Sequence, residues 1–126
     1  MTRFTLLEHT GAPDDPVGRH FDLLLQVGQA CCAWRLFEIP LPGGECVTAL
    51  QIAPHRLQWL DHVAGDVSGG RGSAQRIDAG SYEVLSADDV NLAAATTIIV
   101  HIQGDLLSGR LRIEAFHKGW AVSLSG

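Results

Sequence analysis

Short apolar runs separated by turn residues limit most strongly how this chain can fold. The 126 residues include 14 glycines, and the runs between turns are rich in β-branched or alternating apolar side chains. Side chains alternate with a period of two along a strand, so runs of this length predict strands joined by turns. We expect strands over residues 3–8, 21–27, 30–38, 47–53, 72–77, 81–85, 96–103, 106–116 and 120–124.

Helical signal is much weaker than strand signal. Only residues 86–95, which begin with a Ser or Asp N-cap pattern, and one turn within 55–62 are typical of helix. Gly28-Gln29 and Asp78-Ala79-Gly80 predict tight hairpin turns, the first of type II′ with glycine in the leading position. Since there is no internal repeat or linker, we expect one all-β domain over residues 1–126, either a barrel or a sandwich.

Composition and charge narrow the classes of function. The chain is 46% hydrophobic, has no signal-peptide pattern, and has no apolar run near the roughly 20 residues of a membrane helix. We therefore expect a cytoplasmic protein that does not insert into membranes.

A formal charge of -5 with scattered Lys and Arg disfavours extended duplex binding, but it allows a pocket for one phosphate or strand end. The three cysteines, Cys31, Cys32 and Cys46, are odd in number, which disfavours a set of disulfides and predicts reduced thiols.

The stretch Arg19–Val27 carries the candidate metal ligands. As a strand it places His20 and Asp22 on one face, roughly 6.6 Å apart at about 3.3 Å per residue. Both can lean onto one ion, and His9 completes a His-His-Asp set that leaves positions for water and a substrate oxygen. The alternative is three surface or hydrogen-bonded residues without a metal. The turn-rich segment Thr10–Gly18 joins the two histidines, and we expect it to cross the barrel mouth.

Other residues have the chemistry to bind a phosphoryl group. His55 can donate to a phosphoryl oxygen or act as a general acid, or it can simply be a loop histidine. Ser68-Gly69-Gly70-Arg71-Gly72 combines accessible amides with a guanidinium, which suits an anion, although a flexible hairpin loop is an equal interpretation. Trp59 is a core or rim aromatic that could also stack on a base. Asp14 and Asp15 could offer oxygens to a metal, but turn formers or an Asx cap are the preferred interpretation.

Several short motifs follow one another in a distinctive order. They are Leu7-Glu8-His9, His20-Phe21-Asp22-Leu23-Leu24-Leu25-Gln26, Ala33-Trp34, His55-Arg56-Leu57-Gln58-Trp59, Arg76-Ile77-Asp78-Ala79-Gly80-Ser81-Tyr82 and Gly104-Asp105-Leu106-Leu107-Ser108-Gly109-Arg110-Leu111. In order and spacing they resemble the 3′-phosphoesterase domain of bacterial DNA ligase D, over about residues 3–125. That family shows Q-x-H, H-Y-D-L-R-L-E, S-W-A-V-P-K-G-P, E-D-H-P-L-x-Y, W-D-x-G-x-[WY] and G-x-x-L-x-G-x-[WF].

The resemblance implies a fold, a reaction and a site. The implied fold is mainly all-β, a small closed antiparallel β-barrel with one or two short helices. The family is a manganese-dependent hydrolase of DNA repair that removes a terminal ribonucleoside and then the 3′-phosphate. By this likeness His9, His20 and Asp22 are the ligands of a divalent metal, with manganese first and zinc second, and His55 contacts the phosphate. The resemblance also implies a monomer. Its partners would be a 3′ end of DNA or RNA or a small phosphate ester, together with end-joining repair proteins.

The chain departs from the family pattern around the phosphate. Leu24 stands where the family has arginine, Glu38 where it has lysine, and Trp59 where it has tyrosine. The acidic residue before the family's D-H-P motif is also replaced, around Ala53-Pro54. The metal ligands therefore persist while several phosphate-binding residues are missing.

Two arginines are candidates to replace the missing residues. Arg35 and Arg71 lie in segments similar to W-R-L and V-S-G-x-R-G of short relatives of the family. We expect a stand-alone phosphoesterase with His55, Arg71 and Arg35 as its catalytic residues. The alternative is a catalytically degenerate module of the same fold that binds metal or phosphate at nucleic-acid ends or in protein complexes. A third possibility is a structural domain in which the histidines are fortuitous.

Overall fold

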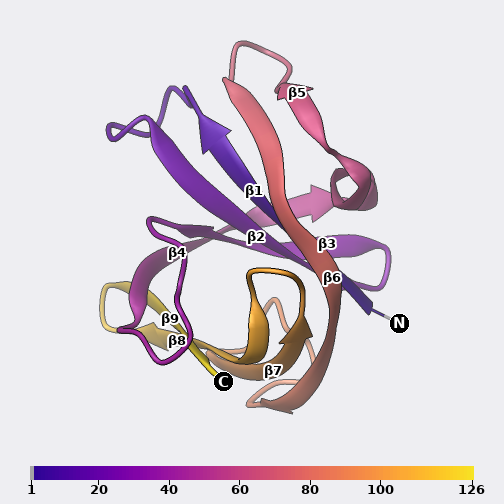
Figure 1. The fold of residues 1–126 in the computed structure, drawn as a ribbon, viewed down its shortest axis with the longest axis vertical. Coiled ribbons are helices and arrows are strands. Elements are labelled where there is room, and N and C mark those ends of the chain that lie inside the picture. The colour runs from indigo at the N-terminus through magenta and orange to yellow at the C-terminus, as the bar shows by residue number, and fades with distance from the viewer. Residues whose placement is uncertain (1) are drawn as a thin grey trace.

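The computed structural model describes residues 2–126 as one antiparallel sheet that closes on itself (Figure 1). Its elements are β1 (Thr2–Thr10), β2 (Arg19–Val27), β3 (Ala30–Leu36), β4 (Val47–Arg56), the 3-10 helix η1 (Leu57–Asp61), β5 (Ala64–Asp66), β6 (Ser73–Ala87), β7 (Thr97–Gln103), β8 (Ser108–Phe116) and β9 (Gly119–Ser125). The strand order is β1-β2-β3-β4-β9-β8-β7-β6-β5, and a further pairing of β1 with β6 closes the ring. The mainly all-β class and the closed antiparallel sheet are therefore confirmed.

The long strand β6 connects two parts of the molecule. Its first residues pair with β1 on one side and with β5 on the other, and its last residues pair with β7. In Figure 1 the β1–β2 hairpin and β5 stand above the ring that β4, β7, β8 and β9 complete below. One side of the β1–β2–β3 sheet thus faces the ring interior, while its other side is free to form a separate surface.

This β1–β2–β3 sheet buries side chains on both of its sides. On the side toward the ring interior, the inner face, Leu23 and Trp34 join a large apolar cluster to which every strand of the ring contributes. The Trp34 and Trp120 rings meet edge to face there, with centroids 5.8 Å apart. On the opposite side, the outer face, a smaller apolar cluster contains Leu7, Leu24, Cys31, Ala33 and Leu60. Successive strand residues point to opposite faces, so the near-continuous apolar run of β2 reflects burial on both sides.

The hairpin predicted to turn at Asp78-Ala79-Gly80 does not form. One continuous strand, β6, passes through this segment. The buried Asp78 carboxylate accepts hydrogen bonds of 2.8–3.1 Å from the backbone N–H groups of residues 105–107. Gly80 lies so close to β7 that a Cβ would come within 1.9 Å of the Gln103 carbonyl oxygen. These turn-forming residues therefore serve a long-range connection and a close strand contact, which local propensity does not reveal.

One of the two predicted helical segments is present. The turn expected within 55–62 is the 3-10 helix η1. Residues 86–95 form no helix, since Ser86 and Ala87 continue β6 and Asp88 accepts hydrogen bonds from the backbone N–H groups of Thr96 and Thr97. The Asp88 carboxylate thus closes a loop instead of capping a helix. No helix within residues 2–126 is long and apolar enough to cross a membrane.

Candidate metal centre

Strands β1 and β2 bring the three predicted metal ligands together on the outer face. His9 and His20 are direct partners across the antiparallel pair, and Asp22 lies two residues further along β2. One ligand atom from each residue lies within 4.8 Å of the other two. His9 Nδ1 is 3.4 Å from Asp22 Oδ2, and His20 Nε2 is 3.3 Å from Asp22 Oδ1. A divalent ion with bonds of roughly 2.1 Å holds neighbouring ligand atoms about 3 Å apart, so these separations suit one ion.

The second ring nitrogen of each histidine has a partner outside this group. His9 Nε2 lies 2.6 Å from the backbone carbonyl oxygen of Arg71. His20 Nδ1 lies 2.8 Å from Asp15 Oδ2. Metal-binding histidines in proteins usually make such a contact with a carbonyl or a carboxylate, because it orients the ring. Both histidines are therefore held in the way that metal ligands are held.

Two polar atoms between these side chains lack any protein partner. His20 Nε2 and Asp22 Oδ1 are both buried and form no hydrogen bond. Buried polar atoms in proteins nearly always have a partner, and an unpartnered one costs about 1–3 kcal/mol. A cation between the two would satisfy both at once. Imidazole nitrogen and carboxylate oxygen together suit manganese or zinc, so the residues fit the implied metal.

The charge environment of the group also favours a cation. Burial opposes the charged form of His20, but the Asp22 and Asp15 carboxylates beside the ring outweigh it and raise the pKa of this histidine above its ordinary value. The hydrogen bond with His20 lowers the pKa of Asp15 below its ordinary value. The side chain of His20 is 0% exposed and that of Asp22 is 7% exposed. The protein thus stabilises positive charge at a point that water scarcely reaches.

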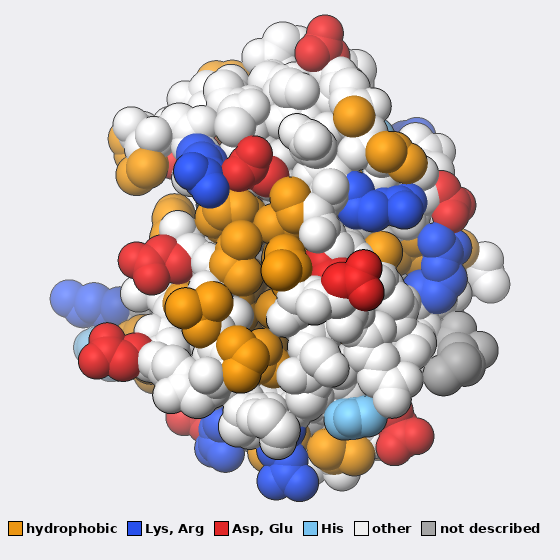
Figure 2. All heavy atoms as spheres, in the orientation of Figure 1, with side chains coloured by type: hydrophobic (Ala, Val, Ile, Leu, Met, Phe, Trp, Pro, Cys, Tyr) orange, Lys and Arg blue, Asp and Glu red, His pale blue; other side chains and the backbone are white. Residues whose placement is uncertain are grey.

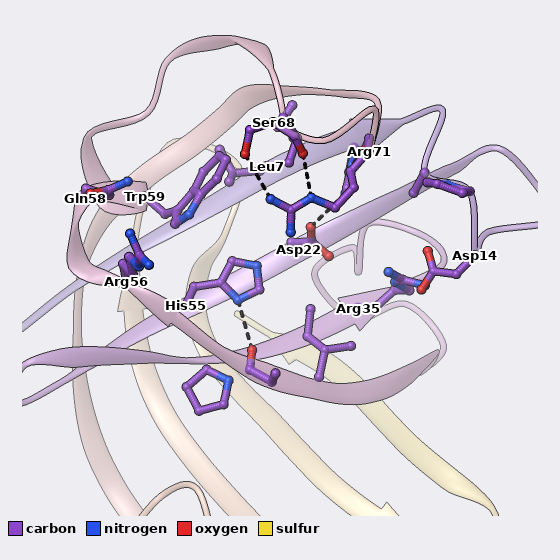
Figure 3. A pocket seen from close by; sticks show the side chains of 18 residues that line it. Leu7, Asp14, Asp22, Arg35, His55, Arg56, Gln58, Trp59, Ser68 and Arg71 are labelled. Carbon is purple, nitrogen blue, oxygen red and sulfur yellow. Dashed lines mark hydrogen bonds and ion pairs between the residues drawn. The ribbon is translucent and has the colours of Figure 1, made fainter.

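The group borders a cleft of about 770 Å³ on the outer face (Figure 3). Five of the six predicted site residues line it, and His20 lies buried behind Asp22. In Figure 3 the side chains of Asp22, His55 and Arg71 point into the cleft from β2, from β4 and from the loop between β5 and β6. The lining residues are Leu7, His9, Ala12, Pro13, Asp14, Asp22, Arg35, Ile52, Ala53, Pro54, His55, Arg56, Gln58, Trp59, Val67, Ser68, Arg71 and Ala74.

Arg71, in the glycine-rich loop after β5, makes one contact through its backbone and another through its side chain. The Arg71 carbonyl oxygen accepts the hydrogen bond from His9, while its guanidinium donates to the carbonyl and hydroxyl oxygens of Ser68 at 2.7 and 3.1 Å. Gly72 has a φ of +85°, and a Cβ there would come within 2.0 Å of the Thr10 carbonyl oxygen. This loop therefore requires glycine at position 72, where it packs against the end of β1. The sequence pattern placed Arg71 at an anion site, but it did not reveal the contact with His9.

Arg35 and His55 occupy different walls of the cleft. Arg35 Nη1 is 3.3 Å from Asp14 Oδ2, and its buried Nε has no partner. His55 Nδ1 donates to the Ala53 carbonyl oxygen at 3.0 Å, which leaves Nε2 available to a ligand. Both residues thus carry nitrogen atoms that can contact an anion in the cleft.

Trp59 stands between two histidines at one end of the cleft. Its ring centroid lies 6.3 Å from that of His55 and 4.8 Å from that of His62. His62 in turn donates to the Ala74 carbonyl oxygen at 2.9 Å. His62, which the sequence did not single out, therefore supports the aromatic wall of the cleft.

One expectation about the site needs correction. The segment Thr10–Gly18 does not cross the mouth of the ring, because His20 and Asp22 point away from the inner face and the segment borders the outer cleft. Asp15 is a turn former as expected, since its Oδ1 accepts a hydrogen bond from the Val17 N–H at 3.0 Å, and its Oδ2 in addition contacts His20. The available signal was a carboxylate between two candidate histidine ligands.

The positions at which the chain departs from the ligase D pattern differ in environment, and among them Trp59, Ala53 and Pro54 line the cleft. Leu24 is fully buried in the smaller apolar cluster beneath η1, and Glu38 is exposed and does not line the cleft. The positions therefore contribute no charge to the centre.

A comparison of the sequence with protein-family models finds no match, and no curated protein matches the chain.

Proposed function

We propose that the protein is a metal-dependent phosphoesterase that acts on a 3′ end of DNA or RNA or on a small phosphate ester. The observation that carries this proposal is the pair of unpartnered buried atoms, His20 Nε2 and Asp22 Oδ1, beside a cleft that holds Arg35, Arg71 and His55. A cation site next to guanidinium and imidazole donors is the combination that phosphoryl transfer requires. The ordered resemblance to ligase D phosphoesterase domains supports the same reaction class.

The residues of the cleft divide the work of hydrolysis. A divalent ion, Mn²⁺ first and Zn²⁺ second, supplies Lewis-acid polarisation of a phosphoryl oxygen and a more acidic water. Arg71 and Arg35 offset the negative charge of the phosphoryl oxygens through their N–H donors. The Ala53 carbonyl accepts from His55 Nδ1–H, so His55 can donate from Nε2 to a non-bridging oxygen or to the leaving oxygen once its ring is protonated.

The size and lining of the cleft favour an ester with a sizeable organic part. At about 770 Å³ it falls in the usual range for whole ligands and far exceeds a single phosphate. Ile52, Pro54 and Trp59 add apolar surface to the lining of the cleft. The basic side chains visible in Figure 2 are scattered among acidic ones, so the view shows no stripe for a long duplex. A strand end fits this arrangement better than a continuous helix does.

A second candidate function follows from the contacts of the two arginines. Arg71 is already bound to Ser68, and Arg35 is paired with Asp14. Leu24 supplies no additional guanidinium beside the ligands. These contacts favour a module of the same fold that binds a metal and a phosphorylated end without turnover.

A direct assay separates the two candidates. Purified untagged protein is incubated with Mn²⁺ and a primer that ends in a 3′-phosphate or a single ribonucleotide. We expect trimming that is lost in His20→Ala and reduced about 100-fold in His55→Ala. His101→Ala is the matched control, because His101 is exposed on β7 outside the cleft. Metal and 3′-phosphate binding without product selects the binding module, and absence of bound metal refutes both candidates.

A further inference from the structure

We infer that Asp15 is the positioning residue of the metal centre and holds His20 so that this histidine presents Nε2, while His9 presents Nδ1. The two histidines thus offer different ring nitrogens. This inference rests on the proposed metal centre, but its test separates the two. Asp15 touches neither substrate nor ion, and it acts only through His20.

The contact between Asp15 and His20 is sealed from water. Asp15 Oδ2 lies 2.8 Å from His20 Nδ1, and the two side chains are 1% and 0% exposed. By contrast, His20 Nε2 lies 3.3 Å from Asp22 Oδ1 and forms no hydrogen bond. A carboxylate is an acceptor, so the shorter contact requires a proton on Nδ1. The neutral ring then directs its lone pair at Nε2 toward Asp22.

The loop between β1 and β2 holds Asp15 in place. Asp15 Oδ1 accepts from the Val17 N–H at 3.0 Å, and its own backbone N–H donates to the Ala12 carbonyl oxygen at 3.1 Å. Its carbonyl oxygen accepts from the Gly18 N–H at 3.1 Å, and Gly11 donates to Gly18 to close the loop. Because all these groups are engaged, the carboxylate has little freedom to rotate away. The loop therefore works as a preformed support for one metal ligand.

The second histidine is held by the opposite nitrogen. The Arg71 carbonyl oxygen, 2.6 Å from His9 Nε2, can only accept, so His9 carries its proton on Nε2 and its lone pair on Nδ1. Nδ1 is the atom that lies 3.4 Å from Asp22 Oδ2. The two supports come from two loops, the β1–β2 loop and the β5–β6 loop, which contact each other at Gly11 and Gly72. Together they aim two lone pairs and one carboxylate at the same point.

Histidine tautomers and metal affinity test the inference independently of activity. Long-range ¹H–¹⁵N spectra of the metal-free protein at alkaline pH and of the Zn²⁺-loaded protein report which nitrogen carries the proton. We expect Nδ1–H for His20 and Nε2–H for His9. Competition between the protein and a chelator for Zn²⁺ and Co²⁺ gives the affinity, which we expect to fall about 10- to 100-fold in Asp15→Ala. Asp15→Asn keeps an acceptor oxygen and should restore the tautomer and part of the affinity.

The matched control is Asp89→Asn. Asp89 accepts a backbone hydrogen bond from the residue two positions ahead, as Asp15 does, but it lies in the β6–β7 loop outside the cleft. An Nε2–H proton on neutral His20, or an unchanged metal affinity in Asp15→Ala, overturns the inference. If the wild-type protein binds no metal, the proposed function fails, while the tautomer of metal-free His20 still decides the role of Asp15. If Asp15→Ala does not fold, Asp15→Asn carries the test through the Co²⁺ absorption spectrum.

Discussion

Both faces of β2 are buried, but they differ in whether their buried atoms have partners. Leu23 on the inner face and His20 on the outer face are each 0% exposed. Leu23 is surrounded by apolar side chains that complete its environment, whereas His20 has a buried nitrogen without a partner. Burial therefore does not distinguish the structural face from the candidate functional face. What distinguishes the outer face of β2 is that two unpartnered buried atoms, His20 Nε2 and Asp22 Oδ1, lie 3.3 Å apart there, so that one cation can satisfy both.

The outer face itself has two parts. Its apolar part, the cluster around Leu24, packs beneath η1, and its polar part, with His9, His20 and Asp22, opens to the cleft. The boundary between them runs through one strand, because Asp22 and Leu24 are two residues apart on the same side of β2. This boundary is sharp enough to be tested by substitution.

The largest effect on stability is expected from Leu24→Arg, which introduces arginine at the position where the resembling ligase D domains have one. Leu24 is fully buried among apolar side chains, so an arginine there places an uncompensated charge in an apolar site. We expect the free energy of unfolding to fall by about 4 kcal/mol, as measured by urea denaturation. If the variant keeps its stability and binds phosphate more tightly, the apolar and polar parts of the outer face are not separate.

Leu23→Ala should lower stability by about 3 kcal/mol without affecting metal affinity. Leu23 belongs to the inner cluster and points away from the ligands, so its loss creates a cavity on the structural face only. Urea denaturation gives the stability, and titration with Zn²⁺ gives the affinity. A large change in affinity would show that the two faces are coupled through the strand.

Metal binding should raise the free energy of unfolding, and this increase should depend on the outer-face ligands and not on the inner-face residues. Zn²⁺ at 100 times its dissociation constant should raise the free energy of unfolding by about 2.7 kcal/mol. His20→Ala removes a ligand and should abolish this increment, whereas Leu23→Ala should retain it. Thermal unfolding with and without metal is the measurement, and an equal increment in His20→Ala would contradict the assignment of the ligands.

In Gly72→Ala the left-handed backbone conformation by itself should lower the free energy of unfolding by about 1–2 kcal/mol, because it places a side chain at a φ of +85°. The new Cβ would also collide with the Thr10 carbonyl and displace the Arg71 carbonyl from His9, so metal affinity should fall. Gly70→Ala is the matched control, since φ is +69° there and no atom lies within 4 Å of an added Cβ. Equal losses of metal affinity in both variants would show that contact with β1 does not matter.

Much of the ring and of the ligand set could be predicted from local pattern. Alternation along residues 19–27 placed His20 and Asp22 on one face, and the two-residue turn at Gly28-Gln29 is confirmed, with Gly28 at a φ of +60°. The strand β5 was not predicted, because its three residues Ala64–Asp66 are exposed and carry no strand pattern. That strand exists through its pairing with β6.

The predictions that failed share a physical cause. Asp78 has the local signature of a turn residue, yet its carboxylate accepts hydrogen bonds from a segment 27 to 29 residues away. Asp88 looks like a helix cap but bonds to Thr96. In both cases a distant partner competes with a local one, and a single sequence contains no information on which partner comes close.

By itself the sequence determined the all-β class, the alternation of the strands and the shared face of His20 and Asp22, because these depend on neighbours within a few residues, whereas the contact of His9 with them requires the pairing of β1 with β2. The tertiary structure decided that the ligands face outward, that Asp15 holds His20, and that the Arg71 carbonyl holds His9. These features depend on the pairing of β1 with β6, which closes the ring, and on the β1–β2 and β5–β6 loops, which contact each other beside the strand pair. Which side of a strand faces the core is settled by the packing of all the strands together.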